Sequence, residues 1–208
     1  MGQDKARLHY HGATLLEHAI ALSGQVTSDV RVLCGQTRRY EDAGVPVVQD
    51  AICGVGPVGG LYSALLSASV DGRDRTFWLA VDLPLVPASF VAGLVKGLDR
   101  ADVVMARTHR GPEPLCAAFR TEPALAAVRR ALIEGRLKLT SALDGLLVHT
   151  IEANAATFAN VNTTTEYERL CSGGGGGRGA ANAGPNVPDE FSKAGTVKIT
   201  PKAVAKKK

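Results

Sequence analysis

Four short stretches of the sequence carry groups that could bind a phosphorylated ligand. Asp82 follows an apolar run in LAVDLPLVP, and Asp50 precedes the glycine-rich loop of QDAICGVGPVGGLYSAL. Lys5 lies beside a glycine turn in MGQDKARL, and Asn160 and Asn162 alternate in FANVNTTTEY. A carboxylate can hold Mg²⁺ while substrate phosphates complete its coordination, and a lysine neutralises phosphate as a point charge. These residue types are those of a metal and phosphate site.

Each of these stretches also has an explanation without a ligand. An aspartate at the end of a strand often bonds its own backbone in a turn, as Asp82 could. Lys5 could be an ordinary surface lysine, and Asn162 could simply start the following helix. Alternation places the amides of Asn160 and Asn162 on one face of an extended segment. Both interpretations therefore stay open for each stretch taken alone.

The loop after Asp50 contains Gly54, Gly56, Gly59 and Gly60 and leads directly into a helical pattern. Glycines let a backbone approach a planar or anionic ligand closely, and the amino end of a helix offers unpaired N–H groups. A tight strand-to-helix turn would use the same residues. The spacing is not the GxGxxG fingerprint, because the strand and the acidic partner of that fingerprint are not in the required places.

Strands and helices alternate along the chain in an order that positions these residues. Short runs rich in branched or aromatic residues predict strands at 29–35, 45–50, 75–82 and 101–106. Helices are expected at 14–24, with a capping box of Thr14 and Glu17, and at 121–135, with Thr121 as its cap. Further helices are expected at 58–69, 88–98 and 163–171. This alternation predicts an α/β fold whose mostly parallel sheet has helices on both faces. In such folds ligands bind beyond the carboxyl ends of the strands, where Asp50 and Asp82 are expected.

Composition and cysteine spacing limit the possible cellular compartment of the protein and the possible roles of its cysteines. A hydrophobic fraction of 45% in 208 residues allows one sizeable core, while no apolar run reaches the roughly 18 residues of a membrane span. The amino terminus shows no signal-peptide pattern, so we expect a cytoplasmic protein without membrane contact. Cysteines 34, 53, 116 and 171 lie far apart without a CxxC pair, which favours free thiols over a zinc site or disulfides.

The net charge of +4 arises in the carboxyl-terminal part of the chain. Residues 172–208 hold a glycine run, a lysine-rich end and few large apolar side chains. We therefore predict a disordered tail at 172–208 that follows a domain at 1–171. The domain itself has a slight excess of acidic residues, so the high pI gives no indication of nucleic-acid binding.

The order and spacing of these stretches resemble those of the bacterial molybdenum cofactor guanylyltransferases. The similarity covers residues 1 to about 170 and includes GPEPLCAAF and EGRLKL, which lie between the stretches around Asp82 and Asn160. The resemblance implies a Rossmann-like, three-layer nucleotidyltransferase fold. It also implies transfer of GMP from Mg²⁺-bound GTP to the terminal phosphate of the molybdenum cofactor, molybdopterin, with release of pyrophosphate.

By position, the resemblance assigns roles to individual residues. Lys5 resembles the lysine that contacts the GTP phosphates, and Asp82 resembles the Mg²⁺ ligand. Asp50 and the glycines Gly56, Gly59 and Gly60 resemble contacts to guanine and ribose. Arg136, Asn160 and Asn162 resemble residues on the side of the pterin acceptor. The partners implied are GTP, molybdopterin, and the acceptor molybdoenzymes with their chaperones.

Two departures from the family pattern affect these expectations. Cys34 stands where these enzymes often place an asparagine near the nucleotide. The family motif runs as a buried strand, L-A-G-G, a few residues, R-M-G and then D-K, and MGQDK matches only its end. We therefore expect an in-frame strand and glycine loop to be encoded upstream of Met1. A sheet without that strand is expected to have two unpaired edges inside the layer.

Two other functions stay open at this point. A molybdenum cofactor cytidylyltransferase is the nearest alternative, although GPVGGL after Asp50 and the pair Asp4 and Lys5 favour the guanine branch. A non-catalytic homologue that binds a nucleotide or cofactor is the alternative from another class, because it would retain the fold without the phosphate loop.

Overall fold

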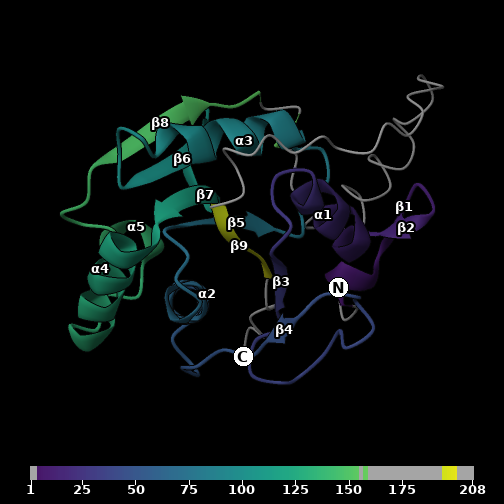
Figure 1. The fold of residues 1–208 in the computed structure, drawn as a ribbon, viewed down its shortest axis with the longest axis horizontal. Helices are drawn as coiled ribbons and strands as arrows, with labels where there is room; N and C mark the ends of the chain where they lie inside the picture. The colour runs from purple at the N-terminus through teal and green to yellow at the C-terminus, as the bar shows by residue number, and fades with distance from the viewer. Residues whose placement is uncertain (1–3, 155–156, 159–193, 201–208) are drawn as a thin grey trace.

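The computed structural model describes residues 4–154, 157–158 and 194–200, which form an α/β fold (Figure 1). The helices among them are η1 (Lys5–Arg7, a 3-10 turn), α1 (Leu15–Gly24), α2 (Pro57–Val70), α3 (Ala88–Gly97), α4 (Thr121–Ile133) and α5 (Leu139–Ala142). The strands are β1 (His9–Tyr10), β2 (Ala13–Thr14), β3 (Val30–Leu33), β4 (Val47–Val48), β5 (Arg75–Ala80), β6 (Val103–Thr108), β7 (Gly111–Arg120), β8 (Val148–Glu152) and β9 (Ala194–Thr200). Among the helices of this part of the chain, none has the length and apolar character that crossing a membrane requires.

The central sheet is mostly parallel, as the alternation of strands and helices predicted. Within the described residues its order is β4-β3-β9-β5-β7-β6-β8, and β7 alone runs antiparallel to its neighbours. Strands β1 and β2 form a separate antiparallel hairpin. Because β3, β4, β5 and β9 are mutually parallel, they all end at the same edge of the sheet, which we call the carboxyl edge.

Strand β9 lies in the middle of the sheet although it comes from the end of the chain. Its residue Val197 pairs with Val30 of β3 on one side and with Phe77 of β5 on the other. The prediction of disorder for 172–208 is therefore wrong for residues 194–200, and the rest of that range lies outside the described residues. The expected pair of unpaired edges inside the sheet is also wrong for the described structure, because β9 lies between β3 and β5.

Propensity and pairing together account for this strand. The segment AGTVKIT is rich in β-branched residues, which favour extended backbone. A position between two parallel strands supplies backbone partners on both sides, and these hydrogen bonds offset the entropy lost when the segment is ordered.

Side chains of β5 alternate between two hydrophobic clusters on opposite faces of the sheet. Phe77 and Leu79 pack in one cluster with side chains of α1 and α3. Trp78 packs in the other cluster with side chains of α2, α4 and α5. Figure 1 shows the resulting layers, with α1 and α3 on one side of the strands and α2 and α4 on the other. Burial of β5 on both faces explains its nearly continuous apolar run and confirms the three-layer arrangement.

Local sequence signals set the start of α1 but only approximately that of α4. The hydroxyl of Thr14 accepts a hydrogen bond from the Glu17 N–H at 3.1 Å, and the Glu17 carboxylate accepts one from the Thr14 N–H at 2.6 Å, so the predicted capping box is present. Helix α4 begins at Thr121, whereas Thr121 was expected to cap it. The Thr121 hydroxyl lies 3.0 Å from that of Thr76, which shows that a tertiary contact has replaced the local one.

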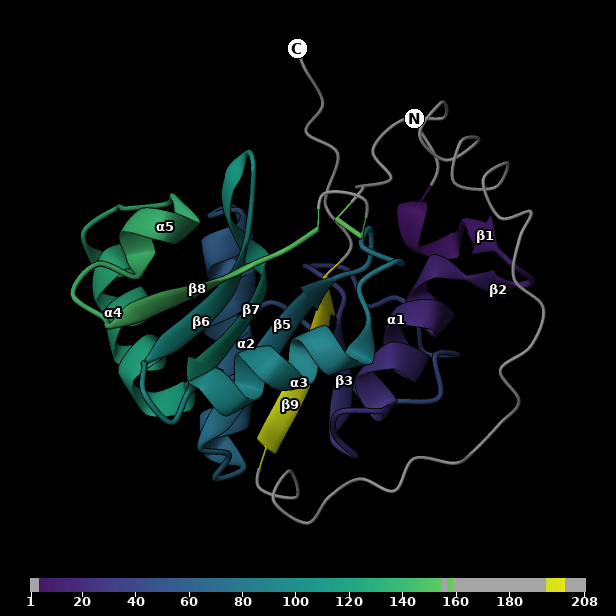
Figure 2. The same ribbon diagram turned by 90° about the horizontal axis from the view of Figure 1, so that it is seen from above.

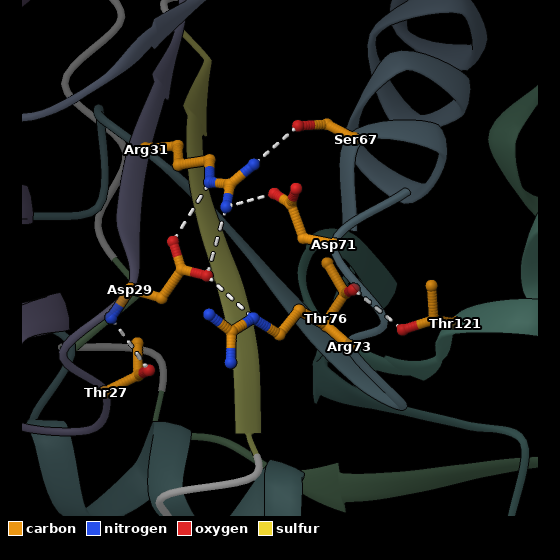
Figure 3. A network of polar contacts seen from close by, with 8 residues as sticks. All are labelled: Thr27, Asp29, Arg31, Ser67, Asp71, Arg73, Thr76 and Thr121. Carbon is orange, nitrogen blue, oxygen red and sulfur yellow. Dashed lines mark hydrogen bonds and ion pairs between the residues drawn. The ribbon is translucent and has the colours of Figure 1, made fainter. Parts of the chain in front are cut away.

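A polar network joins β3 to α2 and to the loop before β5 at the opposite edge of the sheet (Figure 3). Asp29 accepts a hydrogen bond from Arg31 Nε at 2.9 Å and forms an ion pair with Arg73 Nε at 3.0 Å. Arg31 also donates to Ser67 Oγ at 2.8 Å and pairs with Asp71, the residue that caps the end of α2. Since β9 runs between β3 and β5, the network ties together elements on both sides of the inserted strand.

Candidate active site

The carboxyl edge brings together residues that follow β4 and β5. Asp50 comes two residues after the end of β4, and Asp82 comes two residues after the end of β5. Thr200 at the end of β9 pairs with Ala80, so the strand between β3 and β5 ends at the same level. Asp50 and Asp82 therefore both lie beyond the ends of parallel strands, as the sequence predicted.

Asp82 is a buried carboxylate, with only 3% of the residue exposed. Its neighbours Val81 and Leu83 are buried as well, and the Leu83 N–H donates to the Ala80 carbonyl at 3.3 Å in a turn that leads toward α3. Burial removes most of the hydration of a carboxylate, and an adjacent cation can compensate for that cost. The position fits a residue that holds a cation at the edge of the sheet.

Lys5 lies in the 3-10 turn η1 and is also buried, with 8% of the residue exposed. Asp4 caps this turn, because its Oδ1 accepts a hydrogen bond from the Ala6 N–H at 3.1 Å. The carbonyl of Leu8, just after the turn, accepts a hydrogen bond from the Leu15 N–H at 2.9 Å, which ties the segment to the start of α1. Lysines are seldom buried without a specific partner or role, so the structure does not support the alternative of an ordinary surface lysine.

One hydrophobic cluster connects the segments that carry Lys5 and Asp82. Ala6, next to Lys5, is fully buried in the same cluster as Val81 and Leu83, which flank Asp82. The 3-10 turn and the turn after β5 therefore pack on the same face of the sheet. This packing places a potential cation and a carboxylate on one face at the carboxyl edge.

Two hydrogen bonds hold the backbone at Asp50 and Ala51 in place. The Asp50 N–H donates to the Gly35 carbonyl at 2.9 Å, which joins it to the loop after β3. The Ala51 N–H donates to Ser63 Oγ at 2.8 Å, and that hydroxyl donates to the Gly59 carbonyl at 2.7 Å. Ser63 was not among the residues predicted from the sequence, although its position four residues after Gly59 is the spacing at which a helical serine bonds a backbone carbonyl.

The glycines of the loop serve two different structural purposes. Gly56 is the exposed N-cap of α2, with φ 64° and ψ −149°, a region essentially restricted to glycine, and no side chain caps the helix end that follows. Gly59 and Gly60 are buried in the first turn of α2. A Cβ on Gly59 would lie 2.6 Å from Val55 Cγ2, and one on Gly60 would lie 3.3 Å from the Trp78 ring. Close packing thus explains Gly59 and Gly60, whereas Gly56 leads into N–H groups that could meet an anion.

Arg136, predicted for the acceptor side, bonds within its own neighbourhood. Its Nε donates to Glu134 Oε2 at 2.7 Å, and its Nη1 donates to the Ser141 carbonyl. Figure 2 shows α5, which begins at Leu139, and η1 near opposite ends of the same edge of the sheet. Arg136 therefore bonds to α5, an element that lies well to one side of the turn that carries Lys5.

Asn160 and Asn162 lie outside the described residues. The last described residue ahead of them, Phe158, is buried and packs edge-on against Phe90 of α3, with ring centroids 5.5 Å apart. The helix α3 follows the turn that contains Asp82. The contact with Phe90 therefore anchors the chain to α3 two residues before Asn160.

The described residues contain no cluster of three or more His, Cys, Asp or Glu side chains that could hold a metal ion by themselves. A single buried carboxylate fits a different kind of metal site, in which water and substrate supply the other ligands. Mg²⁺ usually keeps several waters and is held by one or two carboxylates together with the phosphates of a substrate. Asp82 fits such an ion, which would arrive with a nucleotide.

Known proteins are similar to this chain in sequence or in fold. A probable molybdenum cofactor guanylyltransferase of Mycobacterium ulcerans is 30% identical over 171 residues, which cover 80% of this chain and 84% of that protein. The crystal structure of a molybdopterin-guanine dinucleotide biosynthesis protein A from Archaeoglobus fulgidus has the same fold, with a TM-score of 0.65, 21% identity, and coverage of 82% of this chain and 90% of that chain. A Mycobacterium tuberculosis protein of this fold, solved in complex with manganese, has a TM-score of 0.56 and 12% identity, with coverage of 81% of this chain and 91% of that chain.

The family model for the MobA-like NTP transferase domain matches residues 1–146, which include η1, the loop after Asp50 and Asp82. It covers well over half of the chain, and the similarity to the mycobacterial relative covers 80% of the chain. The chain belongs to the MobA-like NTP transferase family.

Proposed function

We propose that this protein transfers GMP from GTP to the terminal phosphate of the molybdenum cofactor. An oxygen of that terminal phosphate attacks the α-phosphorus of GTP, the bond between the α-phosphorus and the bridging oxygen to the β-phosphate breaks, and pyrophosphate leaves. The products are the guanine dinucleotide form of the cofactor and pyrophosphate. Such a transfer depends mainly on alignment and on neutralising the charge of the leaving group.

Asp82 and Lys5 have the chemistry that this neutralisation needs. Asp82 would hold Mg²⁺, which supplies positive charge to the phosphate oxygens when it is bound. Lys5 would add a second positive charge toward the same phosphates. Both residues are buried, and water-excluded charges interact more strongly than charges at the surface.

The loop after Asp50 is proposed to bind the guanosine part of GTP. Asp50 can accept hydrogen bonds from guanine or ribose, and Gly56 allows a close approach of the backbone just before α2. Gly59 and Gly60 support this contact indirectly, because they let the first turn of α2 pack against Val55 and Trp78. Arg136, Asn160 and Asn162 are proposed for the acceptor side, and acceptor molybdoenzymes with their chaperones are the proposed recipients of the product.

The observation that carries this proposal is the placement of the Asp82 carboxylate. It is buried at the carboxyl edge, in a turn that shares a hydrophobic cluster with the segment of Lys5. Membership of the family then gives that arrangement a substrate class, since the Mycobacterium ulcerans relative named above is a probable molybdenum cofactor guanylyltransferase.

Turnover by the full chain tests the proposal. The purified protein is mixed with GTP, Mg²⁺ and molybdopterin cofactor, and both pyrophosphate and the dinucleotide product are measured. Chelation of Mg²⁺ should abolish turnover, and added Mg²⁺ should restore it. The variant Asp82→Asn should lose at least about 100-fold in kcat/KM, because a group that stabilises transition-state charge is typically worth that much.

The matched control is Asp74→Asn. Asp74 lies just before β5 and Asp82 just after it, and the Asp74 side chain is 62% exposed with only a 3.6 Å ion pair to Arg75. The Asp74→Asn variant should keep turnover within about twofold, because an exposed ion pair contributes little. Equal losses in both variants would contradict the role proposed for Asp82.

A further inference from the structure

Tyr40, in the loop between β3 and β4, bonds to the turn that carries Lys5, and it is a buried link beside the exposed ion pair of Asp42 with Arg7. The Tyr40 hydroxyl donates to Asp4 Oδ2 at 2.6 Å, although the two residues are 36 positions apart. The Tyr40 residue is buried, with 3% exposed, in the same hydrophobic cluster as Ala6. The contact is therefore a tertiary bond inside the packed part of the molecule.

Asp4 uses its two carboxylate oxygens for two different partners. While Oδ2 accepts the bond from Tyr40, Oδ1 accepts the N–H of Ala6 and so caps η1, whose first residue is Lys5. The Asp4 carbonyl also accepts a bond from the Arg7 N–H at 3.0 Å. One aspartate thus links Tyr40 directly to the backbone that sets the position of Lys5.

The backbone of Tyr40 is strained. Its φ of 64° lies in the left-handed region, which a residue with a Cβ adopts at a cost. Such conformations persist only where the surroundings enforce them, and they concentrate at functional sites. Here the buried ring and the bond to Asp4 hold the conformation in place.

Two arginine side chains lie near the Tyr40 ring, in addition to the hydrogen bond between its hydroxyl and Asp4. The guanidinium groups of Arg7 and Arg39 lie 5.4 Å and 5.5 Å from the ring centroid, and Arg39 Nη1 lies 3.8 Å from Asp4 Oδ2. Burial, and to a smaller extent the hydrogen bond to Asp4, raises the pKa of the Tyr40 hydroxyl above its ordinary value. The hydroxyl therefore keeps its proton at neutral pH and acts as the donor.

We propose that Tyr40 is a positioning residue for the nucleotide site, because its hydroxyl fixes the Asp4 carboxylate that caps η1 and thereby holds Lys5 at the carboxyl edge. This inference rests on the proposed function in one respect, namely that Lys5 meets the phosphates of GTP. The link itself depends only on the hydrogen bonds from the Tyr40 hydroxyl and the Ala6 N–H to Asp4.

The variant Tyr40→Phe removes the hydroxyl and keeps the ring. It should raise the KM for GTP about 10-fold, since loss of a hydrogen bond to a charged group typically has an effect of this size. The melting temperature should fall by no more than a few degrees, since one hydrogen bond is lost and the core is retained. In an Asp4→Ala background the Tyr40→Phe change should have no further effect on KM, because the two residues act through one bond.

Asp42→Asn is the matched control. It breaks the two 2.7 Å bonds between Asp42 and Arg7 beside the ring and leaves the bond from Tyr40 to Asp4 intact. This control should keep the KM for GTP within about twofold, as expected for an exposed ion pair.

A second readout does not depend on turnover. Lys5 is buried, whereas Lys96 on α3 is exposed, so an amine-reactive reagent should modify Lys5 slowly relative to Lys96 in the full chain. Tyr40→Phe should increase the relative modification of Lys5, as read by mass spectrometry, and Asp42→Asn should not. Unchanged KM and unchanged Lys5 modification in Tyr40→Phe would overturn the inference. If the wild-type chain does not turn over GTP while Tyr40→Phe still increases the relative modification of Lys5, the proposed function would be contradicted and the positioning role of Tyr40 would be supported.

Discussion

Gly59 shows at the scale of a single residue how packing can require a glycine inside a helix. An ideal Cβ there would lie 2.6 Å from Val55 Cγ2 and 3.0 Å from the Ile52 carbonyl oxygen, and a backbone oxygen cannot easily move away. We expect Gly59→Ala to lower the free energy of unfolding by about 1–3 kcal/mol, as overpacking generally does. Urea denaturation measures this change.

Gly93 of α3 provides the control, because a Cβ there would meet no atom within 4 Å. Gly93→Ala should leave stability unchanged or raise it by up to about 1 kcal/mol, since alanine is the better helix former. If both alanine variants had the same effect on stability, the packing explanation for Gly59 would be wrong.

Glu17 gives α1 a dependence on pH. Hydrogen bonds from the Thr14 N–H, and next from the Thr14 hydroxyl, lower the pKa of the Glu17 carboxyl below its ordinary value. Because the folded-state pKa is the lower one, the stabilisation is complete above the unfolded pKa and is lost as the pH falls through the folded pKa. Glu17→Gln should therefore reduce the free energy of unfolding at pH 7 but not at pH 3, as measured by urea denaturation at both pH values. A difference that stayed the same at both would contradict this account.

Residue-level predictions from the sequence succeeded where the interaction is local. Thr14 and Glu17 are three positions apart, so their capping box follows from spacing alone. Tyr40 and Asp4 are 36 positions apart, and nothing in their spacing signals the bond between them. The buried environments of Gly59 and Gly60 likewise depend on how α2 packs in the fold, so the glycine pattern left open a ligand contact or a tight turn and did not reveal this packing.

At the scale of elements, β9 makes the continuity of the sheet depend on seven residues near the end of the chain. The variant Val197→Pro would remove a backbone N–H from a strand that has neighbours on both sides. We expect a loss of about 3 kcal/mol or more in the free energy of unfolding, because proline is tolerated essentially only in edge strands or at bulges. Val197→Thr keeps the N–H and the β-branched shape, and it should cost distinctly less. Equal stability of the proline variant and the wild type in urea denaturation would show that β9 does not complete the sheet.

The elements that sequence patterns missed have physical reasons for being missed. Strand β7 contains Pro112 and Pro114, which argue against a strand. The structure accommodates them because β5 pairs with β7 only from Cys116 onward, and the pairing with β6 shifts register near the prolines. Strand β9 contains Lys198 and so lacks the continuous apolar pattern expected of a central parallel strand.

At the scale of the whole molecule, the topology decides which site residues meet. A parallel sheet ends its strands at one edge, so the positions of Asp50 and Asp82 could be predicted from strand order in the sequence. The position of Lys5 could not, because it depends on Ala6 entering the same cluster as Val81 and Leu83. Arg136 follows α4, which packs on the other face of the sheet from η1, and it bonds to Ser141 of α5.

The nucleotide incorporated by the full chain tests the central claim most directly. The protein is given equal concentrations of GTP and CTP, with Mg²⁺ and molybdopterin cofactor, and the dinucleotide product is identified by mass spectrometry. The account predicts the guanine dinucleotide as the main product, formed with release of pyrophosphate and lost in Asp82→Asn but not in Asp74→Asn. A main product containing cytosine, or nucleotide binding without any dinucleotide product, would contradict it.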